Sequence, residues 1–216
     1  MDIVNLERKY EVLTRAVLVL KSGGVVVVPT DTVYGLCADA RNKKAIAQVF
    51  TIKARNLREP LPVLIRDFAL LDEVAYVCDK RVRCFLEAVW PGAVTAVLPS
   101  RGWMPLELRS GKLTIGVRIP GESFATELLK TFGRPLVGTS ANVSGKPECA
   151  RVEEVAKQFS RMPVPPDFII DGGVLPGTSS TVVDCTTWPP VILRRGAVPD
   201  GKIFSHVKHA EETNPN

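Results

Sequence analysis

The sequence contains few of the residues from which metal sites and acid–base triads are built. Its two histidines, His206 and His209, lie near the C-terminal end of the 216-residue chain, so a histidine-based triad or metal site in the rest of the chain is nearly excluded. The five cysteines are far apart and none belongs to a C-x-x-C pair. Neither a disulfide framework nor a zinc site is therefore predicted, and we interpret the cysteines as structural thiols.

Several familiar motifs are absent as well. There is no Walker A pattern and no G-x-G-x-x-G, so a nucleotide would have to be held by dispersed lysine, arginine, serine and asparagine side chains. No apolar run is long enough to span a bilayer, and the N-terminus lacks the basic start and apolar core of a signal peptide. We therefore expect a cytoplasmic protein without a membrane partner.

The composition is ordinary for a globular protein, apart from an excess of positive charge. Hydrophobic residues make up 45% and charged residues 24% of the chain, which is long enough for one large domain. Lys and Arg number 28 against 23 Asp and Glu, which gives a formal net charge of +5. This excess favours an anionic partner, but it does not distinguish nucleotide phosphates from RNA.

One stretch organises the predicted fold. Four consecutive valines, Val25–Val28, predict a strand buried on both faces, and Pro29 ends its ladder pairing. Four polar side chains follow directly: Thr30, Asp31, Thr32 and Tyr34. In open α/β sheets, ligands bind at this edge. The alternative is a plain polar loop in which Asp31 caps a following helix.

The rest of the chain alternates between helical and strand patterns. Helices are predicted over residues 3–22, 67–74, 79–90, 122–132 and 151–160. A further helix is predicted to begin after Asn42, its N-cap, and to end near residues 53–58. Strands are predicted over residues 61–65, 93–99, 114–120, 135–138, 167–170, 180–184 and 191–194. Without an internal repeat or linker, the pattern predicts one α/β domain with a twisted mixed β-sheet flanked by helices. This domain covers residues 1–198, and residues 199–216 are expected to form a polar, mobile C-terminal tail.

Three cations lie close together at the end of a predicted helix, namely Lys53, Arg55 and Arg58. Arginine offers a planar fork to two oxygens and lysine offers a point charge, so the group suits a phosphate clamp. Cations also suit any helix C-terminus, where the macrodipole is negative. The spacing alone leaves both interpretations open.

Arg118 lies in the otherwise apolar stretch Ile115–Pro120. A buried guanidinium requires an acceptor, because an unpaired buried charge is strongly destabilising. The acceptor would be a protein carboxylate, or a carboxylate or phosphate of a ligand. The alternative is a half-exposed strand from which Arg118 points into solvent.

Polar side chains also gather at three other predicted strand ends. Residues Thr139–Gly145 contain three hydroxyls and one amide, and Thr178–Thr181 form a second hydroxyl cluster. Such groups orient a phosphate or an amino acid without adding charge. Arg194–Gly196 form a basic strand end. Ser/Thr-rich turns are common, so the shared placement at strand ends is what makes these clusters informative.

Seven blocks of the sequence, taken in order, form a specific set. They are Pro29–Leu36, Lys53–Arg55, Trp90–Gly92, Val117–Pro120, Ser140–Gly145, Ser180–Asp184 and Ile192–Gly196. This set resembles the YrdC/TsaC family, whose members are threonylcarbamoyl-AMP synthases. The resemblance runs from about residue 10 to residue 198.

The resemblance implies a single α/β domain with a large basic cavity on one side of its sheet, and a nucleotidyltransferase activity. L-Threonine, bicarbonate or CO2, and ATP would give threonylcarbamoyl-AMP and pyrophosphate, and a partner complex would pass the threonylcarbamoyl group to tRNA. ATP is then a substrate, and Mg2+ is expected to be held mainly by its triphosphate, with no metal site made of protein residues. Attack of the carbamate on the α-phosphorus needs charge neutralisation and alignment but no protein nucleophile.

The resemblance also assigns site residues. Those expected to bind threonine are Thr32, Arg118, Gly138 and Ser180, with Arg118 pairing with the carboxylate. Those expected to bind ATP are Lys53, Arg55, Thr114, Ser140, Asn142 and Arg194. Lys53 and Arg55 are also expected to be catalytic.

Two positions depart from the family pattern. Glu59 stands where many relatives carry Asn, and we expect it to point away from the phosphates or to help hold a metal. Leu64 stands where many relatives carry His, which removes one polar contact to threonine. Longer relatives append a second domain that covers the nucleotide, so we expect a more open site in a chain that ends at Asn216.

Two other functions remain open. The first is a double-stranded RNA- or tRNA-binding factor without catalysis, although the sequence lacks the exposed aromatic and RG-rich features of common RNA binders. The second is a carbamoyl-adenylate-handling relative that serves hydrogenase maturation. Such domains normally belong to larger chains with cysteine-rich fingers, and none is present in this sequence.

Overall fold

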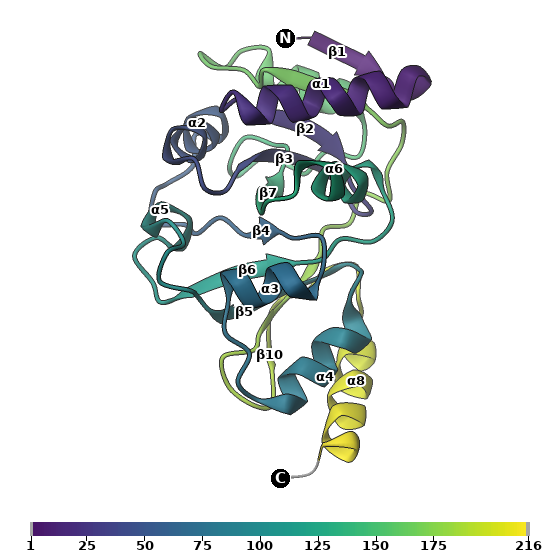
Figure 1. Cartoon of the computed structure of the whole chain (residues 1–216). Coiled ribbons are helices and arrows are strands. Elements are labelled where there is room, and N and C mark those ends of the chain that lie inside the picture. Colours follow the sequence, from purple (N-terminus) through teal and green to yellow (C-terminus); the bar gives the residue numbers. More distant parts are fainter. Residues whose placement is uncertain (1, 215–216) are drawn as a thin grey trace.

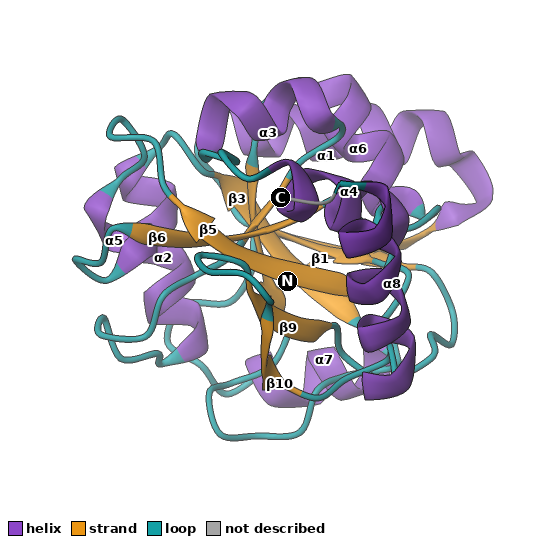
Figure 2. Cartoon of the chain, turned by 90° about the horizontal axis from the view of Figure 1, so that it is seen from below, coloured by secondary structure: helices purple, strands orange, loops and turns teal. Residues whose placement is uncertain are grey.

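A ten-stranded β-sheet runs through the computed structural model, which describes residues 2–214 (Figure 1). The strands are β1 (Asp2–Asn5), β2 (Val26–Pro29), β3 (Tyr34–Asp39), β4 (Val63–Leu64), β5 (Val94–Pro99), β6 (Thr114–Arg118), β7 (Leu136–Ser140), β8 (Phe168–Asp171), β9 (Thr181–Asp184) and β10 (Val191–Arg194). Their order across the sheet is β1-β8-β2-β3-β7-β4-β6-β5-β9-β10, with parallel and antiparallel neighbours. Their directions fan out when the molecule is seen from below (Figure 2), which confirms the predicted twisted mixed sheet.

Helices flank the sheet. They are α1 (Lys9–Lys21), α2 (Lys43–Lys53), α3 (Phe68–Val74), α4 (Lys80–Val89), α5 (Leu106–Arg109), α6 (Phe124–Phe132), α7 (Val152–Phe159) and α8 (Asp200–Thr213), and a short 3-10 helix covers Leu6–Arg8. Helices α1 and α6 pack together and form an apolar cluster with β2, β4 and β7. No helix within the described residues combines the length and the hydropathy needed to cross a bilayer.

Strand β2 confirms the interpretation of the valine run. All four valines are fully buried. Val26 and Val28 pack in the cluster formed with α1 and α6, and Val25 and Val27 pack in the larger core cluster, because side chains alternate along a strand. The chain then turns back into β3, which pairs antiparallel with β2, so the alternative in which Asp31 caps a helix is wrong. The sequence patterns do not predict a strand over residues 34–39, where the structure has β3.

Both ends of the chain differ from the prediction. Residues 3–22 do not form one helix, because β1 pairs with β8 before α1 begins at Lys9. The mobile tail predicted over residues 199–216 is also wrong for most of its length, because α8 packs along α4 (Figure 1). Ile203, Val207 and Ala210 are buried on one side of α8, and this spacing holds the helix against the domain. Residues 215–216 lie outside the described residues.

Candidate active site

A cavity of about 430 Å3 opens on one face of the sheet. Its floor is made by alternate residues of six adjacent strands: Gly35, Gly138, Ser140, Leu64, Thr114, Gly116, Arg118, Thr95, Val97, Val182 and Asp184. Alternate side chains point to the same side, and the pairing of Gly35 with Ser140 and of Gly116 with Val97 keeps these positions on one face. Leu64 also packs in the cluster with α1 and α6, so the cavity lies on the sheet face that these helices cover elsewhere.

A glycine in the floor keeps the cavity open. A Cβ atom added to Gly138 would lie 2.2 Å from Cγ of Leu64, which is far below any real contact distance. Leu64 therefore lies flat on the backbone of β7, and its side chain forms part of the floor. This explains why the site needs glycine at position 138: a side chain there would push Leu64 into the cavity.

Arg118 is buried, with 6% of its surface exposed, and its partner is Asp31. The Nη2 group donates to both carboxylate oxygens of Asp31, at 2.6 and 2.7 Å, and Nε donates to the carbonyl oxygen of Gly92. Asp31 also accepts the backbone N–H of Gly121. Asp31 thus provides the protein carboxylate considered from the sequence, and the pair joins the loops around residues 31, 92 and 121. Contact of Arg118 with a ligand carboxylate stays a prediction.

Thr32 completes this end of the cavity. Its side chain is 2% exposed, and its hydroxyl accepts a hydrogen bond from Nη1 of Arg118 at 3.2 Å. The hydroxyl of Thr30 lies 3.0 Å from that of Thr32 and donates to the carbonyl oxygen of Val33. The neighbouring Tyr34 is fully buried on the opposite face of the sheet and takes no part in the cavity lining.

Lys53, the last residue of α2, lies behind the cavity wall and is 1% exposed. Its ammonium group donates to three acceptors, which are the carbonyl oxygens of Ser140 and Asn142 and Oδ1 of Asn142. The hydroxyl of Ser140 donates to the same Oδ1 at 2.7 Å. Burial lowers the pKa of Lys53 to about 7, and the nearby charge of Arg55 contributes. Lys53 and Asn142 thus fix the end of β7, and of these three residues only Ser140 faces the cavity.

Two further guanidinium groups line the cavity. Arg55 donates to the carbonyl oxygen of Pro60 and pairs with Glu59 at 3.4 Å, so Glu59 is directed to a cation. Arg194 donates to the carbonyl oxygen of Ser180 at 2.8 Å. Burial lowers the pKa of Arg55, the nearby charge of Glu59 opposes this shift, and the charge of Arg194 adds to it.

Eight of the ten residues predicted for the site line this one cavity. They are Thr32, Arg55, Thr114, Arg118, Gly138, Ser140, Ser180 and Arg194. The other two, Lys53 and Asn142, lie directly behind Ser140. Their individual roles in binding or catalysis stay predictions.

Four polar residues of the lining were not among the predicted site residues, namely Thr95, Lys112, Glu148 and Asp184. The hydroxyl of Thr95 lies 2.8 Å from that of Ser180, a contact between distant segments. A signal was available for Lys112, because Lys112, Thr114, Gly116 and Arg118 follow the two-residue period of a strand face.

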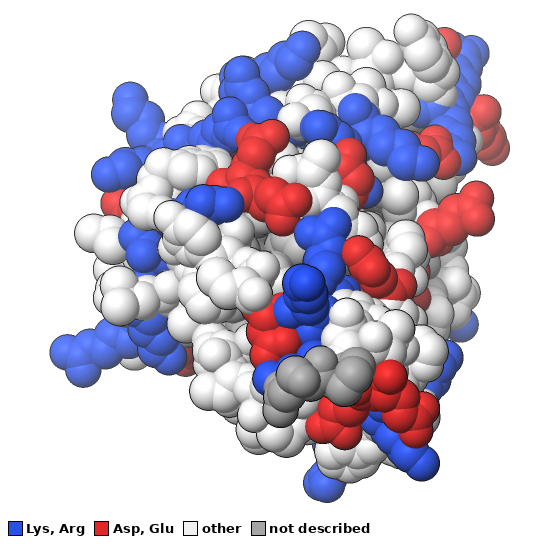
Figure 3. Space-filling view, turned by 60° about the horizontal axis from the view of Figure 1, so that its bottom comes forward, with Lys and Arg blue, Asp and Glu red and all other residues white. Residues whose placement is uncertain are grey.

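The lining carries more positive than negative charge. Four cations (Arg55, Lys112, Arg118 and Arg194) face two carboxylates, Glu148 and Asp184. On the molecular surface, by contrast, Lys and Arg are interspersed with Asp and Glu on the face shown in Figure 3 and form no continuous basic patch there. The arrangement therefore suits a small anionic ligand held on the sheet face.

Comparisons with known proteins agree with this geometry. The protein-family model Sua5/YciO/YrdC, described as telomere recombination, matches residues 18–196. Threonylcarbamoyl-AMP synthase of Pyrococcus abyssi is 37% identical over 181 residues, which cover 83% of this chain and 52% of that protein. The Bacillus subtilis protein of the same name is 33% identical over 188 residues, which cover 86% of this chain and 54% of that protein. The chain thus spans about half the length of these two relatives.

A solved structure gives the same result. The crystal structure of P. abyssi Sua5 complexed with L-threonine superposes with a TM-score of 0.89 at 35% sequence identity. The match covers 95% of this chain and 61% of that chain. The fold therefore has a close counterpart in a protein that was crystallised with L-threonine.

Proposed function

Because the chain belongs to the Sua5/YciO/YrdC family, we propose that it is an L-threonylcarbamoyladenylate synthase, which makes threonylcarbamoyl-AMP and pyrophosphate from L-threonine, bicarbonate or CO2, and ATP. One observation carries the proposal most strongly. A single cavity combines the paired Arg118 and Thr32 with the separate cations Arg55 and Arg194, so one face of the sheet offers distinct places for a zwitterion and a polyanion.

Threonine binds at the Arg118 end. A guanidinium has five N–H donors, and Arg118 uses one on Gly92, two on Asp31 and one on Thr32. One N–H of Nη1 is left for the threonine carboxylate. The hydroxyl groups of Thr32 and Ser180 supply further hydrogen bonds without adding charge.

ATP binds along Arg55, Ser140 and Arg194. The threonine amine and bicarbonate first give a carbamate and water. A carbamate oxygen then forms a bond to the α-phosphorus while the bond to pyrophosphate breaks, and Arg55 and Arg194 offset the charge that moves onto the leaving group. This mechanism needs no protein nucleophile, because the carbamate oxygen is itself the attacking group.

The donor groups fit a cation that arrives with the nucleotide. Within the described residues, no three His, Cys, Asp or Glu side chains come together to hold a metal ion. Mg2+ usually keeps several waters and binds through substrate phosphates with one or two carboxylates, and the lining offers Glu148 and Asp184. When bound, the ion would neutralise triphosphate charge. Glu59 is less suited to this role because it pairs with Arg55.

We further propose that the product is handed to a separate complex that modifies tRNA. Binding of double-stranded RNA as the sole function is less well supported, because the cations that line the cavity face a space of about 430 Å3. That volume matches small-molecule sites and is too small for a duplex.

Pyrophosphate release from ATP by the purified protein tests the function. We expect release that depends on both threonine and bicarbonate, with threonylcarbamoyl-AMP identified by mass spectrometry. Release with carbamoyl phosphate in place of these would support the hydrogenase-maturation alternative, and RNA binding without release would support the RNA-binding alternative. Arg118→Ala should abolish threonine-dependent release, whereas Lys53→Ala should mainly weaken the use of ATP.

A further inference from the structure

The cavity wall beside β6 carries a cation that the roles above do not use. Lys112 lies two residues before β6 and lines the cavity. The other lining cations, Arg55, Arg118 and Arg194, are each anchored by a carboxylate or carbonyl oxygen of the protein. Within residues 2–214, the ammonium of Lys112 forms no hydrogen bond or ion pair with the protein, so all three of its N–H groups are available to a ligand.

The backbone of Lys112 is nevertheless held firmly. Its N–H donates to the carbonyl oxygen of Arg109 at 3.0 Å, and its carbonyl oxygen accepts from Nη1 of Arg109 at 3.2 Å. Between them, Ser110 and Gly111 both adopt left-handed conformations, with φ of 50° and 76°. A left-handed conformation is unfavourable for serine, so this tight turn is held in place by its surroundings. The turn presents Lys112 at a defined place on the wall.

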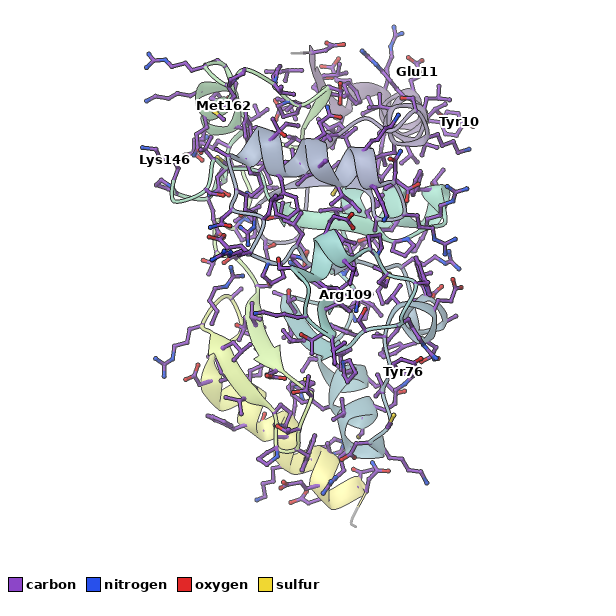
Figure 4. The ribbon with its side chains drawn as sticks, turned by 90° about the vertical axis from the view of Figure 1, so that its left-hand side faces the viewer. Tyr10, Glu11, Tyr76, Arg109, Lys146 and Met162 are labelled. Atoms are coloured by element: carbon purple, nitrogen blue, oxygen red, sulfur yellow. The ribbon has the colours of Figure 1, made fainter. Side chains whose placement is uncertain are left out.

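Arg109 adds an uncompensated charge behind this turn. It is 6% exposed, it pairs with no carboxylate in the described part of the chain, and its Nε is buried without a partner. The hydroxyl of the adjacent Ser110 is likewise buried and unpaired. Figure 4 shows Arg109 near the middle of the molecule, far from Tyr10 and Glu11 at the upper end. A buried cation without a counter-ion makes the wall electropositive, because protein screens charge less than water does.

The turn is joined to the wall that carries Arg55. The backbone N–H of Leu61 donates to the carbonyl oxygen of Leu108 at 2.9 Å, and the carbonyl oxygen of Pro60 accepts from Arg55. Pro60 and Lys112 both line the cavity. The segment that ends in Lys112 is thus hydrogen-bonded to the segment that holds Arg55.

We infer that the turn Arg109–Lys112 is a subsite for a diphosphate group, which in the proposed reaction is the β- and γ-phosphates of ATP and then the leaving pyrophosphate. The inference rests on the proposed function and names the place of its leaving group. The threonine end already holds a neutralised ion pair, and adenine and ribose bring no charge, so the phosphates are the part of the substrates that needs these cations, and the β- and γ-phosphates carry most of their charge. Lys112 contacts the phosphate oxygens, and Arg109 is a positioning residue that fixes its backbone.

Binding of pyrophosphate alone, measured by calorimetry without threonine or ATP, tests this subsite. Lys112→Ala should weaken pyrophosphate binding about tenfold, equivalent to about 1.4 kcal/mol. Binding of AMP and of threonine should not change, and Lys112→Arg should restore most of the affinity. The matched control is Lys130→Ala, which removes an exposed lysine from the last turn of α6, outside the cavity.

Two results would overturn the inference. One is unchanged pyrophosphate affinity in Lys112→Ala, and the other is an equal loss in Lys130→Ala, which would indicate a general effect of net charge. Threonine-dependent pyrophosphate release by the unaltered protein is judged separately. If release is absent but pyrophosphate binding depends on Lys112, the proposed function fails and the diphosphate subsite stands.

Discussion

Replacement of Asp31 tests the architecture of the site most directly. The side chains of Arg118 and Asp31 are 7% and 15% exposed, and Asp31 also accepts the N–H of Gly121. Asp31→Ala therefore leaves a buried guanidinium without its carboxylate and a backbone donor without its acceptor. Breaking a buried pair in this way costs about 3–5 kcal/mol. In a domain of this size such a loss lowers Tm by roughly 10 °C. Thermal unfolding measures the change in Tm, and urea unfolding measures the lost free energy of unfolding.

The same substitution should affect the two substrates differently. Asp31 and Gly92 hold the guanidinium of Arg118 in place, and the proposed contact with the threonine carboxylate depends on this orientation. We therefore expect the KM for threonine to rise far more than the KM for ATP in Asp31→Ala. Asp31→Asn, which keeps the shape and one acceptor oxygen, should fall between Asp31→Ala and the unaltered protein in both assays.

An exposed ion pair supplies the control. Lys9 and Glu127 form a salt bridge with side chains 52% and 41% exposed, so Glu127→Ala should cost no more than about 1 kcal/mol and leave both KM values unchanged. If Asp31→Ala were as mild as Glu127→Ala, Arg118 would not depend on Asp31, and the account of the threonine end would be refuted.

Three further predictions follow from the contacts around the cavity and the C-terminal helix. Lys53 in the folded protein should lose its proton as the pH rises through about 7, so kcat/KM for ATP should fall there, and Lys53→Met should lack this inflection. Because an unfolded lysine stays protonated to about 10.5, the unfolded state binds more protons between these values, and the lowered pKa makes the protein more stable as pH rises. Gly138→Ala should destabilise the protein by about 1–3 kcal/mol and raise the KM for threonine. Because the clash is with Leu64, adding Leu64→Ala to the same chain should restore most of the lost stability. A double-mutant cycle measures this coupling. Ile203→Ala should cost about 2–5 kcal/mol in urea unfolding, whereas Phe204→Ala, at a side chain 56% exposed, should have little effect; equal effects would mean that α8 does not pack as described.

The elements that could be predicted from sequence are those whose signal is local. The valine run identified β2 because an unbroken β-branched stretch has few other interpretations. Asn42 predicted the start of α2, and its side chain does accept from the N–H groups of Lys44 and Ala45. Helix α8 was missed because its three buried residues are spaced among many polar ones, and only contact with α4 shows which side is buried.

The residue types of the site could be predicted from the sequence, whereas the contacts between their side chains could not. Arg118 and Asp31 are 87 residues apart, and nothing local in either segment specifies the other. The resemblance assigns Lys53 to ATP through its place in the K-x-R motif, and the structure shows that its position at the C-terminus of α2 turns its ammonium toward Ser140 and Asn142. Which cations face a ligand and which hold a loop is decided by tertiary packing, which the spacing of residues along the chain does not encode.

Some cations of the cavity are neutralised by a carboxylate and others are not, and this difference gives a physical reason why threonine and the phosphates of ATP would bind in different parts of it. Where the zwitterionic threonine is proposed to bind, Asp31 neutralises Arg118, so that end selects by hydrogen-bond geometry. Toward the phosphates, Arg194 and Lys112 contact no carboxylate within the described residues, and Arg55 shares its charge with the half-exposed Glu59 at 3.4 Å. A polyanion placed at the Arg118 end would meet the carboxylate of Asp31, and a zwitterion placed among the free cations would leave their charge uncompensated. The proposed order of the two substrates in the cavity therefore follows from electrostatics, which would align the carbamate with the α-phosphorus without covalent catalysis by the protein.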